Sequence, residues 1–290
     1  MTYPNSHLLI SVDELAGKLS DPALRLFDTA VFLKPGDSDM QVISGRASYN
    51  EGHIPGAAFL DIQDELSVRN ATLRFTHLPF DALVRAFANA GISDDSEVVF
   101  YASNHPMWAT RAWWLARYCG LGNCRVLDGG LAAWQASGRE IATKASTYPV
   151  GVISSAEEHA ELWADQNAVR SAIANGGVCT VNALPEAIYT GEAPISYGRA
   201  GHISGSVNVP FDALAPNGNW TEAATAEAAL AEQGALSADQ VITYCGGGIA
   251  ATLTAFTLHL LGRDNVAVYD GSMQDWAADA DNPVRIGAEP

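Results

Sequence analysis

Residues 240–262 read QVITYCGGGIAATLTAFTLHLLG, which is a short apolar run, a glycine-rich turn and a long apolar helical stretch. Residues 97–120 read EVVFYASNHPMWATRAWWLARYCG and follow the same order with a slightly longer turn. Short apolar runs that alternate with helical stretches are typical of parallel strands covered on both faces by helices. We therefore predict an α/β fold that occurs twice in the chain.

Two further motifs recur in the same order in both halves. They are GHIPGA at 52–57 with GHISGS at 201–206, and DGG at 128–130 with DGS at 270–272. Each pair is separated by about half of the 290 residues, which indicates two homologous domains rather than a solenoid of short units. We predict an N-terminal domain over 1–142 and a C-terminal domain over 156–290, joined by a polar linker.

The composition limits the classes of partner. The chain carries 16 Lys and Arg against 33 Asp and Glu, a net charge of -17, and 48% of its residues are hydrophobic. An acidic surface repels nucleic-acid phosphates and anionic lipids, so we expect no nucleic acid and no membrane among the partners. No apolar run approaches the ~18 residues of a membrane span, and the first residues show no secretory signal. We expect a cytoplasmic protein.

The four cysteines are too sparse for a disulfide scaffold, and none lies in a CxxC or zinc-type spacing, so we predict no metal site. Cys119, Cys124 and Cys179 are expected to be small buried hydrophobes. Cys245 differs because it stands at the carboxyl end of a predicted strand, just before a predicted helix. Ligands of open parallel sheets bind at this edge, where helix N-termini point free amides outward.

The residues after Cys245 predict an anion-binding loop. Gly246–Gly248 carry no Cβ, so the chain can curl there and aim successive N–H groups at one point. The N–H groups through Ile249 and Ala250, together with the helix terminus, would stabilise a thiolate or an anion carried on its sulfur. We predict that Cys245 is a nucleophile. The structural alternative is one more buried cysteine beside a tight turn.

Two other site types share this turn. Gly246, Gly248 and Ala251 formally match the dinucleotide-binding fingerprint, with Asp264 or Asp270 downstream. That motif normally opens a domain, whereas only about 40 residues follow it here. A cysteine phosphatase would need an arginine six positions after its nucleophile, and that position is Ala251. Nucleotide binding stays open as an alternative, and a phosphatase is disfavoured.

GHIPGA, VLDGGLAAW, VYDGSMQDW and the Cys245 loop together resemble the signatures of the tandem rhodanese family, the thiosulfate and 3-mercaptopyruvate sulfurtransferases. The resemblance covers nearly the whole chain. It implies two rhodanese-like domains, each a parallel sheet flanked by helices, and an enzyme without metal or organic cofactor. It also implies that Cys245 takes a sulfane sulfur from thiosulfate or 3-mercaptopyruvate as a persulfide. The acceptor would be a thiol, cyanide or a thioredoxin-like protein.

The same resemblance implies that the first domain is inactive. Ala102 stands opposite Cys245, and Trp108 lies in the bulky turn that replaces the glycines. This domain is expected to shape the cleft and to perform no transfer. Phe32, Asp61 and His77 match family positions near the cleft. Each also has a purely structural interpretation: Phe32 could pack in the core, Asp61 could cap a turn, and His77 could stand at the entry of a helix.

The chain departs from the family where the substrate anion is held. Gly247 takes the place of a serine or lysine in the loop, and Ala250 that of a threonine. Two arginines usual in the second domain are replaced by Leu184 and Ile188. Because a compact dianion is costly to desolvate without a cation, we expect weak saturation by thiosulfate.

Other arginines could supply the missing charge. Arg199 lies nearby in the sequence, although an exposed surface arginine is an equally good interpretation, and Arg46 or Arg74 of the first half could also serve. If no cation replaces the missing pair, the chain could instead be a sulfur-relay or sensing module. Such a module would take sulfur from a protein persulfide and act only weakly on small donors.

Overall fold

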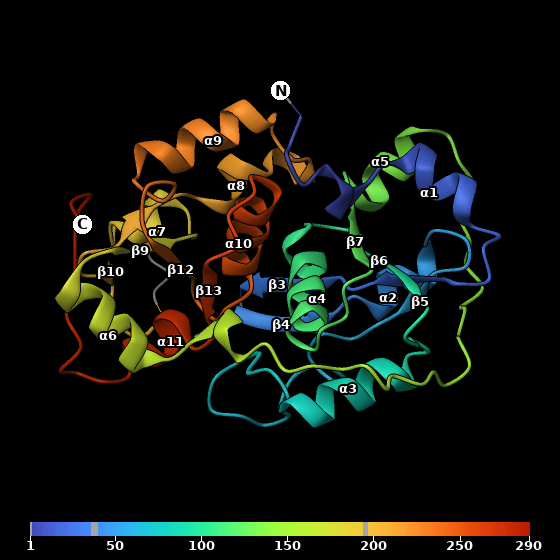
Figure 1. Cartoon of the computed structure of the whole chain (residues 1–290), viewed down its shortest axis with the longest axis horizontal. Coiled ribbons are helices and arrows are strands. Elements are labelled where there is room, and N and C mark those ends of the chain that lie inside the picture. The colour runs from blue at the N-terminus through green and yellow to red at the C-terminus, as the bar shows by residue number, and fades with distance from the viewer. Residues whose placement is uncertain (1, 36–39, 194–196) are drawn as a thin grey trace. The chain divides into compact units, whose positions relative to one another are not determined.

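The computed structural model describes residues 2–35, 40–193 and 197–290 (Figure 1). Helices and short strands alternate along the chain in both halves. No described helix is both long and apolar enough to cross a membrane. Among the described residues, no three His, Cys, Asp or Glu side chains gather in a way that could hold a metal ion. The α/β fold class predicted from the sequence is confirmed.

The chain divides into two compact units that are not continuous in sequence. The N-terminal unit consists of His7–Arg69 and His77–His159. The C-terminal unit consists of the residues before His7, the segment Asn70–Thr76, and Ala160–Pro290. A short piece from the first half of the sequence thus belongs to the unit that carries Cys245.

The N-terminal unit is built on a five-stranded parallel sheet. Its strand order is β1 (Leu9–Ile10), β7 (Cys124–Leu127), β6 (Glu97–Tyr101), β2 (Leu24–Asp28) and β5 (Ala58–Phe59). A separate antiparallel hairpin pairs β3 (Val31–Pro35) with β4 (Met40–Ser44). The two-residue edge strands β1 and β5 leave little unpaired backbone at the sheet margins.

Helices cover both faces of this sheet. They are α1 (Val12–Lys18), α2 (Arg46–Glu51), α3 (Phe80–Asn89), α4 (Met107–Tyr118) and α5 (Gly130–Ala136). Leu15 of α1 and Trp134 of α5 pack with Val99 and Tyr101 of β6 in one buried cluster. Because side chains alternate across a strand, the intervening Val98 and Phe100 point to the opposite face. Helix α4 contacts β6 and β7 and is almost entirely buried.

The C-terminal unit repeats this architecture. Its parallel sheet has the order β8 (Trp163–Ala164), β13 (Val266–Tyr269), β12 (Gln240–Tyr244), β9 (Val178–Asn182) and β11 (Val207–Asn208). Strands β10 (His202–Ile203) and β14 (Val284–Arg285) form a separate antiparallel pair. Each strand of this sheet has its counterpart at the same place in the N-terminal sheet, as expected for two homologous domains.

The helices of the C-terminal unit are α6 (Gln166–Asn175), α7 (Glu186–Tyr189), α8 (Phe211–Leu214), α9 (Ala223–Glu232), α10 (Ala250–Leu260) and α11 (Ser272–Trp276). Short 3-10 turns lie at Ser6–Leu8, Ala160–Leu162 and Pro216–Gly218. Every residue of α10 is buried, and the helix contacts β12, β13 and α8. A helix that is apolar on all sides belongs in a core. This burial fixes its first turn next to the end of β12.

Candidate active site

Cys245 lies at the carboxyl edge of the C-terminal sheet, directly after β12 and five residues before α10 begins. The residue is 3% exposed. Its carbonyl oxygen accepts a hydrogen bond from the Met273 N–H at 3.0 Å, and its own N–H donates to Ser272 Oγ at 3.0 Å. The start of α11 therefore holds the cysteine backbone on both sides. The strand, turn and helix predicted for this stretch are confirmed.

Each of the three glycines after Cys245 has a different close neighbour. A Cβ on Gly246 would lie 2.1 Å from the ring of Tyr197. On Gly247 it would lie 2.9 Å from the side-chain nitrogen of Gln274. Gly248 has φ +77°, a left-handed conformation that favours glycine, and a Cβ there would meet the Asp270 carbonyl oxygen at 2.7 Å. The glycines allow other groups to approach the loop closely, as well as allowing it to turn.

Ser272 organises the loop from the opposite side. Its hydroxyl accepts hydrogen bonds from the N–H groups of Cys245 and Gly248, both at 3.0 Å, and donates to the Tyr269 carbonyl oxygen at 2.8 Å. The serine is fully buried and has φ +49°, which is uncommon for a residue other than glycine. The equivalent residue of the N-terminal unit is Gly130, with φ +54°. The buried hydrogen bonds stabilise the strained backbone of the serine.

Four other amides of the loop have no hydrogen-bond acceptor among the described residues. Within the described chain, the N–H groups of Gly246, Gly247, Ile249 and Ala250 make no hydrogen bond to protein. The last two stand at the amino end of α10, where the helix dipole favours negative charge. Gly248 is excluded from this set because Ser272 takes its N–H. The arrangement can bind an anion located on or beside the Cys245 sulfur.

The other three cysteines lie in surroundings that suppress thiol reactivity. Cys119 and Cys124 are buried, and Cys179 is half-buried. Burial raises the pKa of Cys179 to about 11 and that of Cys119 to about 12, and it raises the pKa of Cys124 still further. Because the thiolate is the nucleophile, these thiols are poor candidates for covalent chemistry near neutral pH. The expectation of burial is confirmed for Cys119 and Cys124 and is only partly met by Cys179.

Gln274 connects the cysteine loop to the segment Asn70–Thr76. Its backbone N–H donates to the Gly246 carbonyl oxygen at 3.0 Å, and its side-chain oxygen accepts from the Arg74 N–H at 3.1 Å. The Arg74 carbonyl oxygen lies 3.7 Å from the position that a Cβ on Gly247 would take. Arg74, named from the sequence only as one possible cation, is therefore adjacent to the loop.

The arginine proposed from sequence beside the site has other partners. Arg199 is half-buried and donates to the carbonyl oxygens of Asn282 at 2.6 Å and Asp279 at 3.3 Å. It thereby ties the chain after α11 to the unit. Leu184 is 5% exposed and Ile188 is half-buried, so both aliphatic replacements contribute to packing. The sequence suggested either a substrate-binding arginine or an exposed surface arginine. Neither interpretation predicted that Arg199 bonds these backbone carbonyl oxygens.

The candidate residues of the N-terminal unit are held by local hydrogen bonds. Asp61 is buried, accepts from the Ser44 hydroxyl at 2.5 Å, and caps the turn that follows through the N–H groups of Gln63 and Asp64. His77 is half-buried, and its Nδ1 lies 2.7 Å from the Leu78 carbonyl oxygen. These contacts are the ones expected of structural residues. A role in substrate binding stays a prediction for both.

The turn equivalent to the cysteine loop is filled in the N-terminal unit. Ala102 follows β6, and the Leu131 N–H bonds its carbonyl oxygen just as Met273 bonds Cys245. The Asn104 side chain donates to the Val31 carbonyl oxygen and accepts from the next N–H. Trp108 is fully buried in α4, whereas Phe32 is half-buried on the hairpin. This turn offers neither a thiol nor a set of adjacent glycine amides.

Sequence reasoning missed three residues around Cys245: Tyr197, Ser272 and Gln274. Ser272 belongs to the repeated DGS motif, so the sequence indicates that its position matters. The sequence does not indicate that its hydroxyl bonds two loop amides. Tyr197 and Gln274 reach the loop through tertiary contacts that have no local sequence pattern. Contacts of this kind could be found only in three dimensions.

Comparison with known proteins is consistent with this geometry. A family model described as a rhodanese-like domain matches residues 11–137 and 185–279. SseB of Mycobacterium tuberculosis, named as a thiosulfate sulfurtransferase, is 33% identical over 97% of each chain. The 3-mercaptopyruvate sulfurtransferase of Escherichia coli is 30% identical over 95% of this chain and 96% of its own.

A solved structure extends the likeness to three dimensions. The crystal structure of the 3-mercaptopyruvate sulfotransferase SseA from Escherichia coli matches with a TM-score of 0.78 at 28% identity. The match covers 91% of this chain and 98% of that chain. Most of the chain thus has a fold already observed experimentally.

Proposed function

The chain belongs to the rhodanese-like domain family, and on that basis we propose that it is a sulfurtransferase with Cys245 as its nucleophile. The donor is thiosulfate or 3-mercaptopyruvate. The observation that carries the proposal is the position of Cys245 at the end of β12, followed by loop amides without an acceptor among the described residues and by the start of a buried helix. The acceptor is cyanide, a thiol or a thioredoxin-like protein.

In the first step the Cys245 thiolate attacks the terminal sulfur of the donor. The new S–S bond forms as the donor's bond to that sulfur breaks, releasing sulfite from thiosulfate or pyruvate, after protonation, from mercaptopyruvate. The negative charge then rests on the outer sulfur of the persulfide. The amides of Gly246, Gly247, Ile249 and Ala250 support the proposal, because oriented N–H groups stabilise such an anion without reorganising.

In the second step the acceptor attacks the outer sulfur and regenerates the Cys245 thiolate. With cyanide the product is thiocyanate, and with a thiol it is a new persulfide. The N-terminal unit takes no part in bond making in this proposal, since Ala102 occupies the equivalent of the cysteine position. The four free cysteines suit a reducing compartment, and we place the protein in the cytoplasm.

The test is a pair of cysteine substitutions assayed for thiocyanate formation from cyanide and each donor. Cys245→Ser should reduce the rate to background, because a serine hydroxyl is scarcely ionised near neutral pH and holds no transferable sulfur. Cys179→Ser is the matched control and should keep most of the activity, since that thiol bonds the Gln233 carbonyl oxygen, away from the Cys245 loop. Activity retained by Cys245→Ser would rule out the mechanism.

A relay that takes sulfur from a protein persulfide is a second candidate function. The observation in its favour is that Leu184 and Ile188 provide no charge and Arg199 is engaged with backbone oxygens. A protein donor would need no small-anion clamp. Sulfur transfer to Cys245 from a persulfidated protein, without transfer from either small donor, would identify this function.

A further inference from the structure

The N-terminal unit contains a pocket whose residues take no part in the proposed sulfur transfer. Its volume is about 420 Å³, within the range of ~300–1,000 Å³ that small-molecule sites have. Residues of α2, β5, α3 and the linker segment (145–148) line it, and four of the lining side chains are aromatic: Phe27, Tyr49, Phe59 and Tyr148. Aromatic walls with a few polar groups are the usual form of a small-molecule site.

Hydrogen bonds hold the linker segment against the rest of the pocket. The Ser146 N–H donates to the Tyr49 hydroxyl at 3.0 Å. The Tyr148 hydroxyl accepts from the Leu26 N–H at 3.0 Å and donates to the Gly56 carbonyl oxygen at 2.9 Å. The pocket is therefore formed before any ligand binds, which keeps the cost of ordering its walls low.

Two exposed residues of opposite charge, Arg46 and Glu65, also line the pocket. The Arg46 guanidinium lies over the Phe59 ring, 4.7 Å from its centroid, and one Glu65 oxygen accepts from the Asp61 N–H at 2.8 Å. Among the described residues, the guanidinium and the other Glu65 oxygen have no hydrogen-bond or ion-pair partner. Partial burial of the Glu65 carboxyl raises its pKa, while the Asp61 hydrogen bond and the nearby charge of Arg46 lower it. The two charges thus influence each other without forming a pair.

We propose that this pocket binds a free α-amino acid whose side chain is aromatic or otherwise apolar. The carboxylate of the amino acid pairs with the Arg46 guanidinium and its ammonium group with the Glu65 carboxylate, both through charge-assisted hydrogen bonds. Its side chain packs against the aromatic walls. A ligand with only a negative charge is repelled by Glu65, and one with only a positive charge is repelled by Arg46. A zwitterion satisfies both groups at once.

The first test compares three ligands on the natural chain by calorimetric titration. L-Phenylalanine carries both charges, 3-phenylpropionate lacks the ammonium group, and phenethylamine lacks the carboxylate. Phenylalanine should bind with a Kd at least about 10-fold lower than either of the others, because each of those loses one charged hydrogen bond. No saturable binding of phenylalanine up to ~10 mM would overturn the proposal, since such an affinity is too weak for a specific site. Equal binding of 3-phenylpropionate or of phenethylamine would overturn it as well.

The second test asks whether each charge recognises the group assigned to it. Arg46→Gln should raise the Kd for phenylalanine about 10-fold and remove its preference over phenethylamine. Glu65→Gln should raise the same Kd by a similar factor and remove the preference over 3-phenylpropionate. Arg69→Ala is the control and should bind phenylalanine as the natural chain does, because Arg69 is exposed, contacts Asp64 and does not line the pocket.

Both variants are expected to fold. The Arg46 side chain is exposed, and Glu65→Gln keeps an oxygen that can accept from the Asp61 N–H. An unchanged Tm would confirm this, and the comparison of ligands on the natural chain decides the question if a variant is unstable. A natural Kd for phenylalanine in folded Arg46→Gln or Glu65→Gln would contradict the assignment of the two charges.

Discussion

Ser272 shows how a single hydroxyl shapes the cysteine loop. It satisfies two amides that would otherwise be buried without partners, and it does so from a left-handed backbone conformation. In the N-terminal unit Gly130 adopts the same conformation, and a Cβ there would lie 2.6 Å from the Ala102 carbonyl oxygen. The cysteine loop of the C-terminal unit therefore has a hydrogen-bonding side chain at the position where the N-terminal unit has a glycine.

Ser272→Ala tests this role. The substitution keeps the strain and removes the acceptor, so we expect the free energy of unfolding to fall by about 1–3 kcal/mol. Displacement of Cys245 should lower kcat by about 10- to 100-fold. Ser272→Gly removes both hydroxyl and strain and should be the more stable of the two variants while remaining equally impaired. Wild-type kcat in both variants would show that the hydroxyl does not position the cysteine.

Asp28 is a buried carboxylic acid at the end of β2, in the position that Asn182 holds at the end of β9. Asp28 Oδ1 accepts from the Ala30 N–H at 2.9 Å, and Asn182 Oδ1 accepts from the Leu184 N–H at 2.7 Å. Burial raises the pKa of Asp28 to about 7. The same turn is thus built once with an ionisable residue and once with a neutral one.

Asp28→Asn should therefore stabilise the protein in a pH-dependent way. Ionisation of the buried Asp28 lowers the free energy of unfolding. This loss of stability is absent below pH ~4, grows as the pH rises, and is complete above the folded pKa of about 7. The raised pKa corresponds to at most about 4 kcal/mol. Urea unfolding should show a clear gain for the variant at pH 8 and little difference at pH 4.5. An equal difference at both values would contradict the assigned ionisation.

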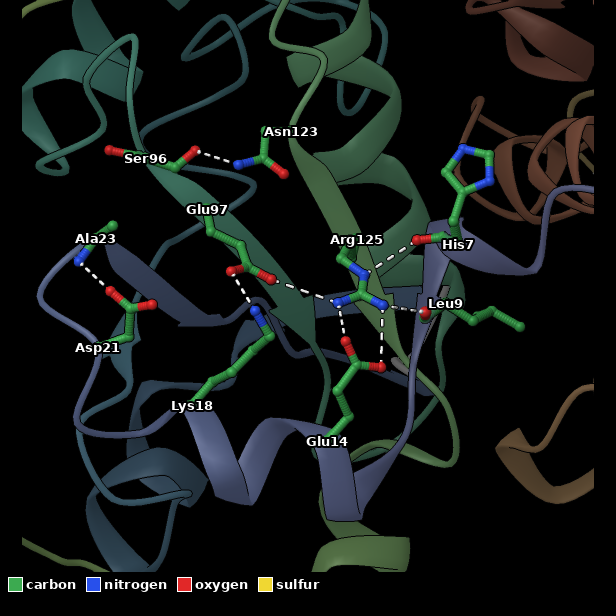
Figure 2. Close-up of polar contacts among 10 residues, drawn as sticks. All are labelled: His7, Leu9, Glu14, Lys18, Asp21, Ala23, Ser96, Glu97, Asn123 and Arg125. Carbon is green, nitrogen blue, oxygen red and sulfur yellow. Dashed lines mark hydrogen bonds and ion pairs between the residues drawn. The ribbon is translucent and has the colours of Figure 1, made fainter.

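At the scale of elements, an ion-pair cluster joins α1 to the amino ends of β6 and β7 (Figure 2). Arg125 of β7 binds both carboxylate oxygens of Glu14 on α1, at 2.5 and 3.1 Å, and also bonds the backbone of His7 and Leu9. Lys18 of α1 bonds Glu97 of β6 at 2.7 Å. The cluster lies at the amino ends of these strands. The turn that contains Ala102 lies at the opposite, carboxyl end of β6.

Arg125→Ala should lower the free energy of unfolding by about 1–3 kcal/mol, because the guanidinium is only 17% exposed and several partners lose their bond. Arg139→Ala is the control, and its exposed pair with Asp13 should contribute less than about 1 kcal/mol. The Arg125 hydrogen bond lowers the pKa of Glu14, so this stabilisation is present above the ordinary carboxyl pKa and lost as pH falls. Equal losses in both variants near neutral pH would show that the cluster adds nothing beyond a surface pair.

The alternation of apolar runs and helices was sufficient to predict the main elements, because parallel strands and their covering helices have strong local patterns. Helix α10 illustrates this, since the long apolar stretch after the glycine-rich turn predicts a helix at this place. The segment Asn70–Thr76 could not be placed in the same way. It has no periodic pattern, and its membership of the C-terminal unit depends on tertiary contacts such as that between Arg74 and Gln274.

In the whole molecule, the same five-stranded sheet occurs twice, and only the C-terminal copy is followed by a turn with a cysteine and adjacent glycines. The internal repeat could be predicted because matching motifs keep their order and spacing. Their positions also located Cys245 and its counterpart Ala102. The orientation of the loop amides could not be predicted, because it depends on the hydroxyl of Ser272 and the packing of Tyr197.

In the proposed mechanism one residue, Cys245, carries the transferred sulfur. The most direct measurement is mass spectrometry of the reduced protein after incubation with 3-mercaptopyruvate, first intact and then as peptides under conditions that preserve persulfides. We expect one added sulfur atom per chain, located on the peptide that contains Cys245 and removed by cyanide. Sulfur located on Cys119, Cys124 or Cys179, or the same added mass in Cys245→Ser, would contradict the role of Cys245.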